Sequence, residues 1–317
     1  MEKISKNPAK LDVLATPAAR KTIDWRSPDS IRAAGFLVFT ILLTALFGHP
    51  LASLMSHAAR SDLHSYILLV PFVSAYLIYL RRNELPKMYG SSPGWAIIPL
   101  ILGLAAFAAW MRLRTFHPAS SENDELTLMA FSFVCFLATG GFLFLGGNWM
   151  KAAAFPIGFL LFMVPLPDQA VYYMETGSKL ASAEAADLFF YVTGTPVFRW
   201  GTIFQLPGIV IEVAQECSGI RSSLVLLIAS VLAANLFLKS PWRRIALVAL
   251  VIPLGIIRNG FRIFVIGSLC VHFGPQMIHS AIHRRGGPLF FGLSLIPLFL
   301  LLWWLRRGET HDDVKIS

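Results

Sequence analysis

The sequence predicts an all-α polytopic membrane protein with about eight transmembrane helices. Hydrophobic residues make up 56% of the 317 residues and charged residues only 14%, whereas a soluble domain carries about 25% charged residues. The apolar residues also fall in blocks, and a block of roughly 20 apolar residues is long enough to cross a bilayer as a helix. This composition excludes a soluble enzyme, a disordered chain and a disulfide-stabilised scaffold.

Eight apolar blocks carry this prediction, and each is expected to be helical because a backbone in lipid must form its hydrogen bonds within the segment. They are residues 33–54, 65–80, 94–111, 126–146, 152–168, 218–238, 245–269 and 286–305. The second and fifth blocks are short for a span. We therefore divide the chain into an N-terminal tail (1–32), one transmembrane domain (33–305) and a C-terminal tail (306–317).

The distribution of Lys and Arg predicts the orientation, because cytoplasmic segments are rich in these residues. Residues 1–32 hold seven of them, and four spans end in a basic segment on the same predicted side. Both tails are therefore expected in the cytoplasm, with residues 55–64, 169–217 and 270–285 outside. The protein should be a multi-pass protein of the inner (plasma) membrane. In a soluble protein the net charge of +9 would suggest contact with nucleic acid or with an anionic membrane, but here the location of each charge matters more than the sum. We expect contact with membrane lipid and none with nucleic acid.

The longest predicted outer segment, 169–217, should contain two elements. Residues Gln169–Tyr191 mix Ala, Leu and Phe with charged residues, which is typical of an amphipathic helix lying on the membrane. Residues Pro196–Val213 alternate apolar and polar side chains on either side of a Pro207-Gly208 turn, which predicts a short β-ribbon. Both elements come directly before the polar start of the sixth span.

The common cofactor motifs are missing from the sequence. It has no Walker A motif, no dinucleotide-binding fingerprint, no HExxH and no CxxC. His279 and His283 have the i, i+4 spacing that can bind a metal, but no carboxylate accompanies them in that loop. We therefore expect neither a cofactor nor a metal.

Three chemically capable residues converge on the predicted outer face. Cys217 stands at the start of the sixth span, and His283 stands just before the eighth. Arg262 comes 18 residues after Arg244, which is roughly 27 Å of helix and brings it close to the outer interface. A thiol, an imidazole and a guanidinium suffice for acyl transfer, with the thiolate as nucleophile. A helix N-terminus also favours the thiolate of Cys217.

The cysteines have simpler interpretations that the sequence leaves open. A single Cys in a membrane protein is most often a small buried apolar residue, and Cys135, inside an apolar block, is expected to serve only in packing. Cys270 could form a disulfide with Cys217 if both face an oxidising compartment.

The arginines of the seventh span also have alternatives. Arg258 and Arg262 are four residues apart and share one helix face, and an ionisable residue inside a membrane indicates a functional site. They could instead form structural ion pairs with Glu212 or Glu216. Arg262 could also extend its side chain to the interface.

These motifs resemble the exosortase/archaeosortase family of polytopic membrane transpeptidases, over roughly residues 60–305. Asp62–Tyr66 is similar to the early span of the family, and Phe159–Pro167 to its central span. Cys217–Ser222 matches its cysteine motif and Asn259–Arg262 its Asn-x-x-Arg motif. His283, followed by Gly287, matches the stretch before its last span.

The resemblance implies a catalytic triad of Cys217, Arg262 and His283, with His279 as the alternative base. It also implies the substrate, a secreted protein with a C-terminal sorting signal: a short motif such as Pro-Glu-Pro, a transmembrane helix and a basic tail. The enzyme would cleave near the motif, form a thioester on Cys217, and pass the acyl group to an acceptor or to water.

The remaining polar residues of these motifs are expected to bind substrate: Arg258, Asn259, Glu216, Arg221 and Arg284. Two of them depart from the resemblance. The family often has a small residue where Glu216 stands, and often has Ala where Arg258 stands. The two could pair with each other, or they could mark a different recognition sequence.

A second function class is a transporter or channel in which Arg258, Arg262 and the histidines line an anion or proton path. A third is a membrane acyltransferase that uses His283. A transporter would favour two related halves with broken helices in matching places, and the sequence has no such duplication.

Overall fold

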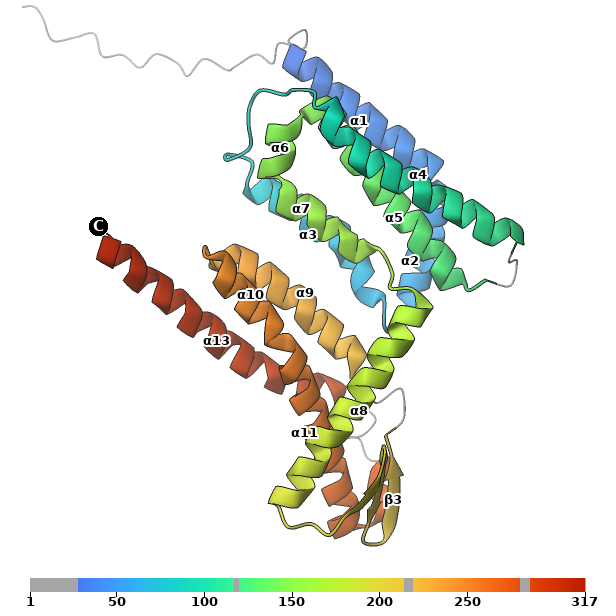
Figure 1. Ribbon diagram of the computed structural model, residues 1–317, viewed down its shortest axis with the longest axis vertical. Coiled ribbons are helices and arrows are strands. Elements are labelled where there is room, and N and C mark those ends of the chain that lie inside the picture. Colours follow the sequence, from blue (N-terminus) through green and yellow to red (C-terminus); the bar gives the residue numbers. More distant parts are fainter. Residues whose placement is uncertain (1–27, 117–119, 214–218, 280–285, 317) are drawn as a thin grey trace, which may run out of the picture.

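The computed structural model describes residues 28–116, 120–213, 219–279 and 286–316 (Figure 1). Its N-terminal part holds these helices: α1 (Pro28–Leu46), α2 (Gly48–Arg60), η1 (Ser65–Leu69), α3 (Val70–Leu80), α4 (Pro93–Phe116), α5 (Glu122–Gly140), the short π-helix η2 (Gly141–Leu145), α6 (Gly147–Ala152), α7 (Ala154–Phe159) and η3 (Leu160–Met163). The later part holds α8 (Asp168–Val192), β1 (Phe198–Trp200), β2 (Ile203–Leu206), β3 (Ile209–Glu212), α9 (Ile220–Phe237), α10 (Pro241–Ala249), α11 (Val251–Phe273), η5 (Pro275–His279) and α13 (Gly287–Ile316).

The predicted fold class, a helical multi-pass membrane protein, is confirmed. Within the described residues, six helical segments are long and apolar enough to cross a membrane: Pro28–Leu46, Pro93–Phe116, Glu122–Leu145, Ile220–Phe237, Pro241–Phe273 and Gly287–Glu309. The other two predicted spans are the ones that the sequence marked as short. One is the shorter apolar helix Ser65–Leu80, and the other is part of a helix pair bent by 88°. The count of eight is therefore approximate.

The first predicted span, 33–54, is broken in the structure. α1 ends at Leu46, and α2 begins at Gly48. Pro50 explains the break, because proline has no N–H to donate to the carbonyl four residues earlier and its ring clashes there. Phe47, between the two helices, is buried, and its ring packs 5.7 Å from that of Phe133.

The fifth predicted span also ends in a sharp bend. Pro165 and Pro167 force the residues before them out of the helical region, and the helix axis turns by 88° between Ala154–Met163 and α8. The start of α5 stabilises this bend, because the side-chain amide of Asn123 donates to the Leu166 carbonyl (2.7 Å) and to an Asp168 carboxylate oxygen (2.8 Å). α8 corresponds to the predicted helix Gln169–Tyr191.

The predicted β-ribbon is a three-stranded antiparallel sheet in the order β1-β2-β3. The difference arises at Gly201, whose φ of +61° lets the chain reverse between Trp200 and Ile203. The alternating pattern runs through this turn, so the sequence suggests one strand where there are two. Phe204 is fully buried, and its ring packs 5.7 Å from that of Phe190 on α8.

α8 and α11 pack closely against each other, and Figure 1 shows them crossing next to the sheet. Small residues make this approach possible. A Cβ on Gly260 would lie 2.5 Å from the Cβ of Ala185 and 3.0 Å from the Ser182 carbonyl oxygen, and one on Gly267 would lie 2.7 Å from the Phe190 ring. Such small-residue contacts are typical of helix pairs in membranes.

This contact generates a prediction. Gly260→Val should destabilise the protein by about 1–3 kcal/mol, because the added side chain forces α8 away from α11. The measurement is the thermal unfolding midpoint of the purified protein in detergent. Gly292→Val in α13 is the matched control, since a Cβ there meets nothing within 4 Å. Equal losses in the two variants would contradict the packing argument.

Candidate active site

The start of α9 lies directly against α11. Gly219, the residue before α9, has a φ of +74°, which favours glycine. A Cβ at this position would lie 3.0 Å from the Asn259 side chain and 3.2 Å from Nη2 of Arg258. Both the backbone conformation at position 219 and the close approach of these two side chains therefore require a glycine there.

The buried guanidinium of Arg258 holds this contact. Its Nη2 donates to the Gly219 carbonyl (3.0 Å) and to Oγ of Ser223 (3.2 Å). The same carbonyl accepts from the Ser223 N–H and from the hydroxyls of Ser222 and Ser223. Arg258 is only 7% exposed, and its Nη1 is buried with no hydrogen-bond partner among the described residues.

The two helices meet again one turn deeper. A Cβ on Gly255 would lie 2.6 Å from Oγ of Ser223, so this glycine makes room for the serine. Gly255 therefore faces Ser223, and Asn259 faces Gly219. An increase of four residues along α11 matches a decrease of four along the other segment, which is the register of an antiparallel pair.

Arg262 lies one turn beyond Arg258 on α11, on the same face, and is partly buried. The neighbouring residue Phe261 connects this end of α11 to two other elements. Its ring lies 5.7 Å from that of Phe189 on α8 and 6.3 Å from that of Phe290 near the start of α13. The start of α13 is thus beside the end of the Asn-x-x-Arg motif.

The predicted outer segment 55–64 also reaches the start of α9. Arg221, in the first turn of α9, forms an ion pair of 2.6 Å with Asp62. Both side chains are exposed, so this pair contributes at most about 1 kcal/mol to stability. It nevertheless fixes which loop lies beside the start of α9.

Two histidines, His57 and His64, lie on either side of Asp62 in the sequence. His64 is 5% exposed, and its ring lies 5.5 Å from that of His57. The Nε2 atoms of both rings are buried without a hydrogen-bond partner among the described residues. Burial lowers the pKa of His64 and His57 lowers it further, whereas Asp168 raises it. His64 is therefore mainly neutral at pH 7.

Four of the predicted site residues are described, and they divide into two groups. Arg258 and Asn259 face Gly219, and Arg262 lies one turn beyond them, whereas Arg221 is engaged by Asp62. Four further predicted residues lie outside the described residues: Cys217, Glu216, His283 and Arg284.

Some of the alternatives left open by the sequence are now decided. Glu212, considered as a partner for the arginines of α11, lies 3.9 Å from Nζ of Lys179. Cys135 and Cys270 are buried free thiols, so Cys270 forms no disulfide here. The described part of the chain holds no group of three or more side chains arranged to bind a metal.

Sequence reasoning missed Gly255 and Ser223, and it gave Asp62 no role at the site. The signal for the first two lies in the spacing, since Gly255 precedes Asn259 by one turn and Ser223 follows Gly219 by one turn. The ion pair of Asp62 carries no local signal, because it joins residues far apart in the chain.

Comparison with known families gives one match. A family model described as transmembrane exosortase matches residues 57–300. The matched region includes Asp62, Gly219 and the Asn259–Arg262 motif, and so covers the whole arrangement above. Comparisons with curated proteins and with solved structures gave no match.

The contact at Gly219 generates a second prediction. Arg258→Met removes a hydrogen bond from a charged donor, which contributes about 1.5–3 kcal/mol, so local opening at the start of α9 should increase roughly tenfold or more. Hydrogen–deuterium exchange of the amides of Ser223 and Leu224 measures this opening.

Arg81→Met is the matched control for this experiment. Arg81 donates to the Asn235 side chain at the other end of α9 (2.6 Å), so its loss should leave exchange at Ser223 unchanged. Unchanged exchange at Ser223 in the Arg258→Met variant would show that Arg258 does not hold the start of the helix.

Proposed function

Since the chain belongs to the transmembrane exosortase family, we propose that it cleaves the C-terminal sorting signals of secreted proteins through a thioester on Cys217. Membership gives the general role, that of a membrane transpeptidase or protease. The nucleophile, the recognition of a Pro-Glu-Pro-like motif and the acceptor are parts of the proposal.

The observation that carries the proposal is the antiparallel register between the start of α9 and α11. Gly255 faces Ser223, and Asn259 faces Gly219. Arg262 lies one turn beyond Arg258 on α11, and Cys217 precedes Gly219 by two residues in the sequence. Two residues of chain span at most about 7 Å, and four residues of helix rise about 6 Å. These lengths therefore allow the Cys217 thiol and the Arg262 guanidinium to come close to each other.

The start of α13 supplies the third group in this proposal. His283 precedes the described Gly286 by three residues, and Phe290 contacts Phe261, the neighbour of Arg262. The chain can therefore bring an imidazole to the same end of α11. His279 is the alternative, one helical turn earlier.

The reaction assigned to these groups has two steps. The Cys217 thiolate attacks the scissile carbonyl, and Arg262 stabilises the oxyanion that forms. Protonated His283 gives its proton to the leaving amine, so that the C–N bond breaks and a thioester remains. In the second step an acceptor amine or water gives a proton to His283 and attacks the thioester, which releases the thiolate.

Substrate binding is assigned to the polar residues around this point: Arg258, Asn259, Glu216, Arg221 and Arg284. Arg258 has the most specific support, because its Nη1 is buried and has no described partner, which leaves it available to Glu216 or to an acidic side chain of the substrate. Arg221 is engaged by Asp62, and we assign it to the rim of the site.

The proposed location follows the distribution of basic residues. Both tails, 1–32 and 306–317, are assigned to the cytoplasm, and the site to the extracytoplasmic face of the plasma membrane. A sorting motif that emerges from the bilayer on that face would meet the start of α9 directly.

The nucleophile generates a third prediction. Cys217→Ala and Cys217→Ser should both abolish processing of a co-expressed protein that ends in a sorting motif, a transmembrane helix and a basic tail. Processing is measured as the size shift of that protein, and thiol alkylation should lose its one fast-reacting site. Cys135→Ala, which changes a buried thiol of α5, is the control. Processing that survives both substitutions of Cys217 would favour the transporter class instead.

The choice of base generates a fourth prediction. General acid–base catalysis contributes about 10²- to 10⁴-fold, so His283→Ala should slow processing by at least about a hundredfold. His279→Ala should leave the rate within a few fold. The initial rate of cleavage under equal expression is the measurement. The reverse order would assign the base to His279.

A further inference from the structure

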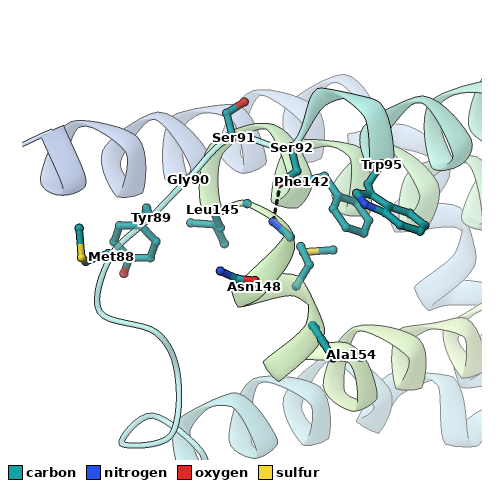
Figure 2. A pocket seen from close by; sticks show the side chains of 14 residues that line it. Met88, Tyr89, Gly90, Ser91, Ser92, Trp95, Phe142, Leu145, Asn148 and Ala154 are labelled. Atoms are coloured by element: carbon teal, nitrogen blue, oxygen red, sulfur yellow. Dashed lines mark hydrogen bonds between the residues drawn. The ribbon is translucent and has the colours of Figure 1, made fainter.

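A cavity of about 760 Å³ (Figure 2) lies beside α6 and the start of α4, at the end of the spans away from the start of α9 (Figure 1). The segment that joins α3 to α4 forms one wall, and the turn between η2 and α6 forms the opposite wall. It shares no residue with the candidate active site and has no part in the proposed reaction.

Backbone contacts between distant segments fix the shape of this cavity. The Gly90 N–H donates to the Leu145 carbonyl (3.1 Å), and the Gly147 N–H donates to Oγ of Ser92 (2.9 Å). Gly146 has a φ of +86°, and a Cβ there would lie 2.9 Å from the Gly90 carbonyl carbon. The two walls are therefore held together, and the cavity is preformed.

The first helix adds a third support. The Tyr89 N–H donates to a carboxylate oxygen of Asp29, in the first turn of α1 (2.9 Å). The segment between α3 and α4, which carries Tyr89, is thus bound both to α1 and to the end of η2.

The lining of the cavity is amphipathic. Its polar part includes Tyr89, Asn148 and Lys151, and its apolar part includes Trp95 and Phe142; no Asp or Glu belongs to it. Figure 2 shows Tyr89 and Asn148 on one side of the cavity, and the Trp95 and Phe142 rings together on another side. A lining of one cation, neutral hydrogen-bond donors and aromatic rings suits an anion that carries an apolar group.

The position of the cavity identifies the class of ligand. Trp95, two residues after the start of α4, is exposed, as are Ile97 and Ile98 further along the same apolar helix. A Trp at the end of a span lies at the level of the lipid headgroups. The predicted orientation puts this end on the cytoplasmic side, where basic pockets between transmembrane helices bind anionic headgroups.

We propose that this cavity binds the headgroup of an anionic phospholipid. Lys151 pairs with the phosphate, and Tyr89 and Asn148 donate hydrogen bonds to its oxygens or to the glycerol. Trp95 and Phe142 pack against the first carbons of an acyl chain. The basic tail of a sorting signal would reach the same side of the membrane, but the lining offers it no carboxylate.

The test uses the purified full chain in detergent and three probes: dihexanoyl phosphatidylglycerol, dihexanoyl phosphatidylcholine and inorganic phosphate. The measurement is the thermal unfolding midpoint as a function of probe concentration, because a ligand that binds the folded state raises it. Phosphatidylglycerol should raise the midpoint. Phosphatidylcholine, which carries no net charge, should need about fivefold higher concentration for the same shift, since one Lys near an anionic surface contributes about 1 kcal/mol. Inorganic phosphate should need at least about fivefold higher concentration, because it lacks the acyl carbons that would pack against Trp95 and Phe142.

Three variants connect the effect to the cavity. Lys151→Gln should raise the required phosphatidylglycerol concentration about fivefold, and Lys151→Arg should restore the wild-type value. Arg82→Gln is the control, because Arg82 is an exposed cation on the adjoining segment whose contacts with described residues are to Tyr79 in its own turn. Lys151 is exposed, so its substitution should leave folding intact.

Several results would overturn the proposal. An equal response of wild type and Lys151→Gln would remove Lys151 from the binding site. An equal response to phosphatidylcholine would mean that the anionic charge is not recognised. A full shift with inorganic phosphate alone would assign the cavity to free phosphate and not to a lipid.

Discussion

The hydrogen bond from Arg258 to the Gly219 carbonyl is the constraint on which the arrangement of the site depends. Burying a guanidinium is costly unless it is hydrogen-bonded, and here Nη2 reaches both the Gly219 carbonyl and Ser223 (3.0 and 3.2 Å). The contact is possible because Gly219 and Gly255 have no side chains in the space between the two segments. A larger residue at either position would separate the start of α9 from α11, and with it the cysteine motif from the Asn-x-x-Arg motif.

α9 is also held at both ends by the N-terminal part of the chain. Asp62 pairs with Arg221 at its start, and Arg81 donates to Asn235 near its end, each at 2.6 Å. Between these contacts, partly buried side chains of α9 such as Ile228 pack against the core formed by α2, α3 and α5. An exposed ion pair adds little stability, so the polar contacts serve mainly to set the position of α9 along its axis. The position of Gly219 along the axis of α9 is therefore set by contacts with α11 and with the segment before η1.

The sequence predicts the spans well, because burial in lipid demands long apolar blocks, and it predicts the helix α8 from its mixed composition. It predicts the breaks poorly. The block around Phe47 remains apolar across Pro50, so the pattern does not show the helix break there. The strand pattern continues through Gly201, so it does not show the chain reversal there. Contacts that depend on close approach are not predictable locally. Gly146 meets Gly90 and Gly260 meets Ala185, and only the folded chain brings these pairs together. The same reason hides the cavity, whose walls are distant in sequence.

Arg258 and Arg262 share one face of α11, but their surroundings differ. They are one turn apart, and the resemblance alone assigns Arg262 to catalysis and Arg258 to substrate binding. The antiparallel register distinguishes them, because Arg258 falls opposite Gly219, where a fixed carbonyl and a serine hydroxyl satisfy its Nη2. Arg262 lies one turn further along α11, away from the Gly219 carbonyl that holds Arg258. An oxyanion is stabilised by donors that the fold holds in place before the reaction, and Nη2 of Arg258 already donates to the Gly219 carbonyl and to Ser223. The proposed oxyanion role therefore suits Arg262, and Arg258 sets the distance at which it acts.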